Sequence, residues 1–255
     1  MINVSDYPLL VFVISFFVLS LSVPIGAKFL RRLLKWEESK REDFGIILGA
    51  TLTLLALIVG FSFSMAVSRY DQRKDYEEAE ANAIGTEYVR ADLLPAADAA
   101  KVRALLKNYL DQRVLFYTTR DRQQILQINA RTAQLQAELW SAVLGPAAAK
   151  PTPMVALAVS GMNDVLNSQG YTQAAWWNRI PNAAWMLMAA IAVCCNVLVG
   201  YGARDFNAER FLLGILPLVV SISFFLIADI DSPRGGIIHV QPENLLSLVE
   251  SLRAH

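Results

Sequence analysis

Four long stretches of this sequence contain no aspartate, glutamate, lysine or arginine, and they constrain the fold more than any other feature. They are Tyr7–Ala27, Phe44–Ser68, Ile180–Ala203 and Phe211–Ala228. The hydrocarbon core of a bilayer is ~30 Å thick, and a helix needs ~20 apolar residues to cross it. Three stretches reach that length, and the fourth, with 18 residues, is mostly leucine, isoleucine, valine and phenylalanine. The sequence therefore predicts four transmembrane helices.

All 46 charged residues lie outside these stretches, 23 basic and 23 acidic, so the chain combines an uncharged membrane part with a water-facing part in charge balance. Zero net charge gives no support for a nucleic-acid partner. Asp6 is the only charged residue before the first stretch, and basic residues follow the stretch. A cleaved signal peptide instead has basic residues before its apolar segment. We therefore expect it to be retained as a span.

The spans divide the chain into four expected regions, and the fold class that follows is an all-α integral membrane protein. A helical extramembrane domain is expected between the second and third spans. The regions are a first transmembrane hairpin at 1–68 (spans at about 7–30 and 44–68), the extramembrane domain at 69–179, a second transmembrane hairpin at 180–228 (spans at about 180–203 and 211–228) and a C-terminal tail at 229–255.

The middle region has helical periodicity. Apolar residues recur at helical spacing in two segments, and their simplest interpretation is the core of a helical bundle. They are Val102, Leu105, Leu106, Tyr109, Leu110 and Val114 in the first segment, and Ile125, Ile128, Leu135, Leu139, Trp140 and Val143 in the second. Pro95 and the stretch 145–153 are expected to break helices, and a further short helix is expected at 154–167.

The second span is expected to leave the membrane without stopping. No proline occurs between Phe44 and Leu94, so one helix of 51 residues, roughly 75 Å long, is predicted. Within it, one stripe is apolar in the middle and bears hydroxyl groups toward the charged end. The stripe consists of Thr53, Leu57, Phe61, Ser64 and Ser68. It suits helix packing, but it also suits a pore wall in which an apolar ring controls a passage by dewetting.

The surrounding motif resembles the bestrophin family of pentameric anion channels. Bestrophins carry a Gly-Phe pair in the second membrane helix and a Ser/Thr-Arg-aromatic step beyond it; here these are Gly60-Phe61 and Ser68-Arg69-Tyr70. The chain resembles the bacterial bestrophin-like family of uncharacterised four-span proteins still more. That group has a similar GFSFSMAVSRYDQR core, an EANAIGT segment and an acidic Pro-Gly-Gly turn, which stand here at 60–73, 80–86 and 229–236.

The resemblance implies a cyclic homo-oligomer, with a pentamer as the family's form, in which the second span lines an anion pore. The stripe Thr53, Leu57, Phe61, Ser64 and Ser68 would line or constrict that pore, and Arg69 would place a positive charge at its mouth. Thr53 departs from the bulkier apolar residue of bestrophins. The acidic calcium clasp of animal bestrophins has no match here, so calcium gating is not implied.

Other features have simpler interpretations. Arg69 also fits an interfacial residue that snorkels toward water. Asp229 and Asp231 could bind a cation, but a turn built around DSPRGG explains them better. Pro217 is expected to kink the fourth span. The tryptophans Trp176, Trp177 and Trp185 fit an aromatic belt at the membrane interface.

The sequence contains no pattern typical of an enzyme or a metal site. The only histidines are His239 and His255, and the two cysteines, Cys194 and Cys195, are adjacent within the third span. Neither a nucleophile–base pair nor a ligand cluster can be recognised. We therefore expect no catalytic activity, no metal and no cofactor.

The functional hypothesis is an oligomeric ion channel, selective for small anions, in the lipid bilayer of the inner (plasma) membrane. The alternative is a membrane sensor, signalling protein or scaffold whose helical domain binds a partner. Membrane orientation stays open at this point. The short loops carry eight basic residues near the spans against five on the other face, which favours extracytoplasmic termini and helical domain. Bestrophins have the opposite orientation.

Overall fold

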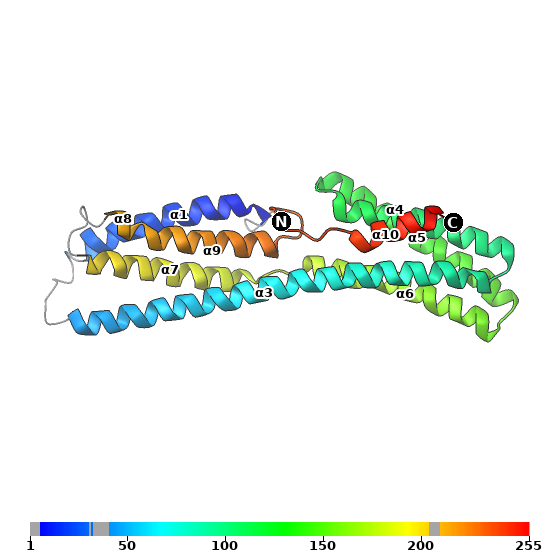
Figure 1. Ribbon diagram of the computed structural model, residues 1–255, viewed down its shortest axis with the longest axis horizontal. Coiled ribbons are helices and arrows are strands. Elements are labelled where there is room, and N and C mark those ends of the chain that lie inside the picture. The colour runs from blue at the N-terminus through cyan, green and yellow to red at the C-terminus, as the bar shows by residue number, and fades with distance from the viewer. Residues whose placement is uncertain (1–5, 31, 33–40, 204–209, 255) are drawn as a thin grey trace. The chain divides into compact units, whose positions relative to one another are not determined.

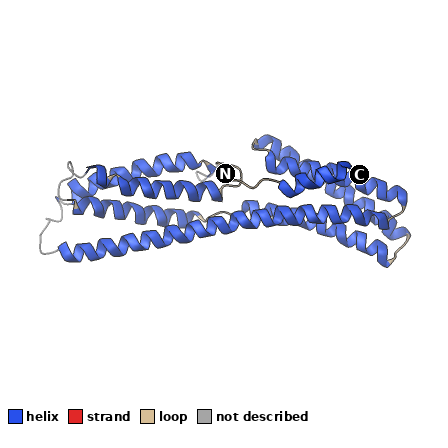
Figure 2. Cartoon of the chain, in the orientation of Figure 1, coloured by secondary structure: helices blue, strands red, loops and turns tan. Residues whose placement is uncertain are grey.

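The computed structural model describes residues 6–30, 32, 41–203 and 210–254, and this part of the chain is helical with short connections (Figures 1 and 2). The all-α class expected from the sequence is confirmed. The elements are α1 (Pro8–Pro24), η2 (Ile25–Leu30), α3 (Arg41–Arg90), η4 (Ala91–Leu93), α4 (Ala96–Thr118), α5 (Arg122–Ala149), α6 (Pro153–Trp177), α7 (Asn182–Gly202), α8 (Arg210–Leu213), α9 (Ile215–Asp231) and α10 (Glu243–Ala254).

The chain forms two compact units, and the 50-residue helix α3 contributes to both. The first unit comprises Met1–Tyr70 and Arg179–His239, and the second comprises Asp71–Asn178 and Val240–His255. The tail after the last apolar helix is divided between the units, with α10 in the second. The uninterrupted second span expected from the absence of proline is thus found as α3.

The first unit contains four helices that are long and apolar enough to cross a membrane. α1 packs against both α9 and α7, and Figure 1 shows the three helices running alongside one another. Their inward faces and one side of α3 share a core of buried apolar residues: Leu19, Leu55, Ala66, Met188, Ala192, Cys195, Val220, Phe224 and Ile227. Among the described residues, the helical stretches that hold these four apolar segments are Pro8–Phe29, Glu42–Leu93, Pro153–Gly202 and Phe211–Asp231, of which the second and third continue into the second unit.

Two glycines let α1, η2 and α7 approach closely. A Cβ atom at Gly200 on α7 would lie 2.0 Å from the carbonyl oxygen of Val23, and one at Gly26 on η2 would lie 1.9 Å from that of Val197. No side chain fits at such distances. Small residues at helix interfaces are the usual means of tight packing in membranes, where hydrophobic attraction between helices is weak.

The last span is interrupted near Pro217, as expected. The helix breaks at Gly214, between α8 and α9, and Pro217 occupies the first turn of α9. Because proline has no backbone N–H, it fits a first turn, where that donor has no helical partner. The interruption therefore lies at Gly214, three residues before Pro217.

The second unit is a bundle in which α5 packs against both α4 and α6. The two amphipathic segments correspond to α4 and α5, and their core-facing residues are buried as expected. These include Val102, Leu106, Tyr109, Leu110, Ile128, Leu135, Leu139 and Val143.

Three expectations for this region are wrong. The short helix expected at 154–167 extends over Pro153–Trp177. The residues after 167 include no proline, and their single glycine, Gly170, does not end the helix. The stretch 145–153 interrupts the helical structure only after Ala149, because the alanines that follow Pro146 favour helix and extend α5 to that residue. Trp176 is buried against Phe116 and Tyr117 and belongs to the bundle core, not to an interfacial belt.

Candidate pore-lining face of α3

Within the first unit, α3 is the least covered of the four long helices. Only 6% of its most apolar 18-residue window is buried, against 39% for the helix that contains α9. Its contact face is narrow: Leu55, Ser62 and Ala66 are buried at positions i, i+7 and i+11. Most of the membrane part of α3 is thus free to contact lipid, water or another molecule.

The five stripe residues of the sequence analysis, Thr53, Leu57, Phe61, Ser64 and Ser68, are all exposed. Leu57 is 52% exposed and Phe61 is 64% exposed. At about 100° per residue, the centre of this stripe lies about 160° around the helix from the centre of the contact face. The stripe therefore faces directly away from the helices of its own unit.

The stripe combines an apolar part with hydroxyl groups. The Thr53 hydroxyl donates to the Gly49 carbonyl oxygen at 2.9 Å, so the first hydroxyl is satisfied within the helix and leaves a largely apolar surface around it. Leu57 and Phe61 follow at one-turn intervals. Beyond them, Ser64 and Ser68 place hydroxyls on the same face toward Arg69, where α3 approaches its charged half.

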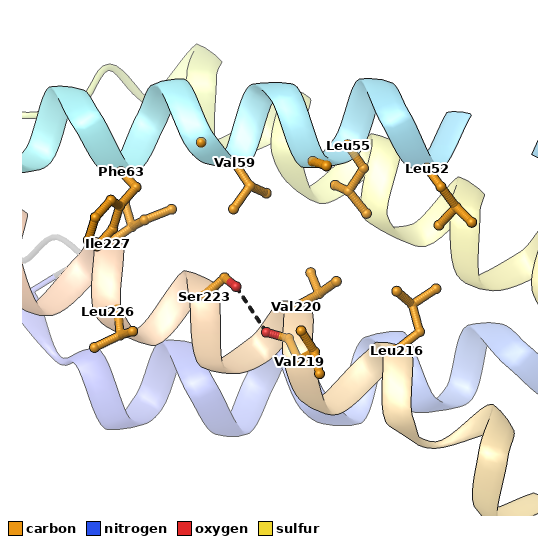
Figure 3. Close-up of a pocket in the computed structure, with 12 residues that line it drawn as sticks. Leu52, Leu55, Val59, Phe63, Leu216, Val219, Val220, Ser223, Leu226 and Ile227 are labelled. Carbon is orange, nitrogen blue, oxygen red and sulfur yellow. Dashed lines mark hydrogen bonds between the residues drawn. The ribbon is translucent and has the colours of Figure 1, made fainter. Parts of the chain in front are cut away.

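A groove of about 430 Å³ runs beside the stripe, between α3 and α9 (Figure 3). Side chains of the two helices point toward each other across it, and the lining is apolar except for Ser223, whose hydroxyl donates to Val219 O at 3.0 Å. The lining residues are Leu52, Leu55, Ala56, Val59, Gly60, Phe63, Leu216, Val219, Val220, Ser223, Leu226 and Ile227.

Arg69 is part of a compact ionic junction. Its guanidinium lies 3.4 Å from the carboxylate of Asp231, which is fully buried at the end of α9. Arg179 pairs with the same carboxylate at 3.4 Å and with Asp6 at 2.6 Å. The backbone N–H of Ile180 donates to both Asp231 oxygens at 3.2 Å. The junction links residues near both ends of the first unit's sequence to α3.

Asp229 closes the turn that follows α9. Its two carboxylate oxygens accept hydrogen bonds of 2.8 Å from the backbone N–H groups of Ile237 and Ile238. Gly236, immediately before Ile237, has a φ of 87°, and a Cβ there would lie 2.0 Å from Oδ1 of Asp229. The turn interpretation of DSPRGG is therefore confirmed for Asp229, while Asp231 is held by arginines. Among the described residues no group of three His, Cys, Asp or Glu side chains could hold a metal ion.

The sequence analysis missed a second feature of α3, a charged face that is buried in the second unit. Arg73, Glu77, Glu80 and Glu87 are each at most 1% exposed. Their spacing of four, three and seven residues puts them on one side of the helix. That periodicity is visible in the sequence, but charged side chains on a helix are ordinarily solvated, so the pattern alone does not indicate a buried face.

Glu80 is the centre of a buried network. Both of its oxygens accept from Arg113 on α4, and the hydroxyls of Tyr117 and Thr172 donate to Oε2 at 3.4 and 3.2 Å. The Arg113 guanidinium also lies over the Phe116 ring, 4.4 Å from its centroid. Burial, followed by the Glu80 charge, raises the pKa of Tyr117. Burial lowers the pKa of Arg113, but the charges of Glu80, Tyr109 and Tyr117 and the hydrogen bond to Glu80 together outweigh it, so the net direction is upward.

Comparisons with known proteins agree with the resemblance seen in the motifs. A family model described as a Bestrophin-like domain matches residues 16–245. A mutant of a bacterial bestrophin homologue from Klebsiella pneumoniae has a TM-score of 0.65 at 13% identity, covering 95% of this chain and 98% of its own. Another structure of that homologue gives 0.62 at 13% identity, covering 93% and 98%.

The comparison with curated protein sequences gave no match. At 13% identity the solved structures establish a shared fold, while the family model covers nearly all of the sequence. Together with the four long apolar helices, these findings show that this chain is a membrane protein of the bestrophin-like family.

Proposed function

We propose that this protein forms a cyclic homo-oligomer in which the α3 helices of all copies surround a pore for small anions. The observation that carries the proposal is the exposed stripe of α3. Five residues at helical spacing face away from every other helix of the unit, and two of them, Leu57 and Phe61, are large and apolar. Lipid can cover the apolar residues, but Ser64 and Ser68 on the same face favour a polar path, and a ring of identical helices supplies one.

A single copy offers no polar path through its membrane part. Its spans contain no charged side chain between their ends, and a polar conduit in lipid must be lined by protein on all sides. A ring of α3 helices satisfies this requirement with one residue from each copy at every level. A pentamer is the number expected from the bestrophin resemblance.

In this assembly Thr53, Leu57 and Phe61 form an apolar neck, and Ser64 and Ser68 line the wider part. Apolar constrictions control conduction by dewetting, because an ion without its water shell is costly to place among hydrocarbon groups. Hydroxyl groups beyond the neck can replace part of the hydration shell of a permeating ion by donating to an anion. Arg69 adds positive charge at the mouth, moderated by its ion pair with Asp231.

In this proposal the region 69–179 is the extramembrane domain. Helix α3 runs from the pore wall into that domain without a break. We place the protein in the inner (plasma) membrane, with the short loops in the cytoplasm as the basic-residue count favours. The competing function, a sensor or scaffold, would use the second unit to bind a partner and would need no conduction.

The decisive experiment measures assembly and flux on the same purified protein. Mass determination in detergent gives the number of copies, and anion flux is recorded after reconstitution into liposomes. The proposal expects a closed ring and an anion flux that protein-free liposomes lack. A monomer or dimer without flux contradicts the channel and leaves the sensor or scaffold function.

A further inference from the structure

Three of these four buried charged residues on α3 have a hydrogen-bond partner or a partner of opposite charge. Glu80 binds Arg113, and Glu77 accepts from the backbone N–H of Leu245 at 2.9 Å and from the Asn244 amide at 2.6 Å. Arg73 donates to the Ala175 carbonyl oxygen at 3.5 Å. Glu87 differs: it is fully buried, and neither carboxylate oxygen has a hydrogen-bond partner among the described residues.

Glu87 lies where α3 crosses α6, directly against the backbone of Gly161. A Cβ added to Gly161 would lie 2.0 Å from Glu87 Oε2 and 2.6 Å from Arg90 Nη1. Gly161 therefore provides the space into which the carboxyl group fits. The backbone N–H of Gly161 does not donate to the Glu87 carboxyl group, because it donates within helix α6.

The charged groups around Glu87 do not neutralise it. On α3, Arg90 lies close by but is shared with Asp164 on α6, which is 3.9 Å away. Asp92 on η4 pairs with Arg103 on α4 at 2.5 Å. Lys107 on α4 donates to the Leu252 carbonyl oxygen at 2.8 Å. Arg90, the cation whose charge acts on Glu87, is thus divided between two carboxylates.

A buried carboxylate with no hydrogen bond pays a large desolvation cost, and the neutral acid avoids it. Burial accordingly raises the pKa of Glu87 from 4.5 to about 8; Arg90 opposes the rise and Asp164 adds to it. The geometry and the charges point in the same direction, because a carboxyl packed on Gly161 beside a second carboxylate is best accommodated with a proton.

We propose that Glu87 is a reversible proton-binding site at the crossing of α3 and α6, occupied at neutral pH, and that loss of the proton loosens the packing of α6 on α3. This inference concerns the second unit alone and does not depend on channel activity. Its consequence for a channel would be a proton-dependent coupling between the helical domain and the helix that lines the pore.

The sign of the stability effect follows from proton linkage. Between the unfolded pKa of 4.5 and the folded pKa of about 8, the folded state holds more protons than the unfolded state. Stability at this site is therefore fully present below the lower value and is lost as the pH rises through the window. For these two pKa values, the folding equilibrium constant falls about fiftyfold from pH 6 to pH 8.

The first measurement detects the proton itself. Infrared difference spectra of the full-length protein in detergent, recorded between pH 5.5 and 9.5, should show the carbonyl band of a protonated carboxyl that disappears with a midpoint near pH 8. Glu87→Gln should remove that band. Asp164→Asn should move its midpoint to lower pH, because it removes a neighbouring negative charge. Glu138→Gln, at a half-exposed carboxylate of α5, should leave the band unchanged.

The second measurement follows packing by hydrogen exchange of α6. The parent protein should exchange faster in α6 at pH 9 than at pH 6 after correction for intrinsic rates, and Glu87→Gln should lose most of this difference. A band that persists in Glu87→Gln, a midpoint below pH 6, or equal exchange of α6 in both proteins would overturn the proposal. If Glu87→Gln fails to fold, Asp164→Asn and the parent titration still decide it.

Discussion

Arg69 on α3 and Asp231 at the end of α9 are bound to each other at 3.4 Å, and the aspartate is completely buried. This ion pair joins the proposed pore helix to the last membrane helix. Arg179 shares the same carboxylate, and the backbone of Ile180 adds a donor. The charge at the end of the stripe is therefore part of a structural junction, whatever it also contributes to ions in a pore.

The junction gives the first prediction. Asp231→Asn leaves two guanidinium groups without their carboxylate, and breaking a buried ion pair in this way costs about 3 kcal/mol. We expect a clear fall in the unfolding midpoint in detergent. Asp6→Asn, at a 39% exposed carboxylate with one arginine partner, is the control and should cost less than about 1 kcal/mol. Equal effects of the two variants would show that burial of Asp231 is not what matters.

The apolar neck gives the second prediction. Phe61→Ala should raise basal anion flux at least severalfold in liposomes, because a smaller side chain widens the constriction and lets water enter. Phe17→Ala is the matched control, since Phe17 is 61% exposed, close to the 64% of Phe61, but lies on α1, away from the stripe. Flux through the control should equal that of the parent. If Phe61→Ala and the parent conduct equally, Phe61 is not the constriction.

Membrane orientation gives the third prediction. In a background with Cys194 and Cys195 replaced by alanine, Ser141→Cys on the exposed face of α5 should react with a membrane-impermeant thiol reagent applied to intact cells. Asp43→Cys, exposed at the start of α3, should react only after the membrane is opened. The reverse pattern would establish the orientation of bestrophins, with the helical domain in the cytoplasm.

The glycine contact gives the fourth prediction. Gly200→Ala puts a methyl group 2.0 Å from the Val23 carbonyl oxygen, so α1 and α7 must separate. Overpacking of this kind costs about 1 to 3 kcal/mol, which unfolding in detergent can measure. Gly170→Ala, in α6 with open space around the glycine, should be neutral or slightly stabilising. Loss of stability in both variants would contradict the steric explanation.

The buried network gives the fifth prediction. Glu80→Gln leaves Arg113 charged and buried without its partner, at a cost of about 3 to 5 kcal/mol. Replacing both residues by leucine should recover much of this loss, because it removes the uncompensated charge. Glu138→Gln, in a half-exposed pair with Arg131, should cost less than about 1 kcal/mol. A double variant as unstable as Glu80→Gln would assign the loss to the hydrogen bonds of Tyr117 and Thr172.

Some local elements needed more than the sequence pattern. Pro146 was expected to end a helix, yet α5 continues to Ala149 because three alanines follow. Trp176 was expected at the membrane interface, yet it packs against Phe116 and Tyr117. A tryptophan one residue earlier or later along a helix points in a different direction, so proximity to a span does not fix its surroundings.

The candidate site was predicted in part. The shared face of the stripe from Thr53 to Ser68 follows from helical spacing alone, and all five residues are exposed, while their place in a pore stays a proposal. The partners of Arg69 did not follow, because Asp231 is 162 residues away and nothing local links the two. Glu87 was also missed, since its neighbour Gly161 becomes its neighbour only when α6 packs on α3.

The sequence by itself determined the four apolar helices, the unbroken helix α3 and the helical bundle of the second unit. These depend on the length of uncharged segments, on the absence of proline and on spacing along one helix, all of which are local. Only the tertiary structure decided which charges are buried and with what they pair. Burial changes the free energy of a charge by several kcal/mol, and it is set by side chains that distant parts of the chain bring together.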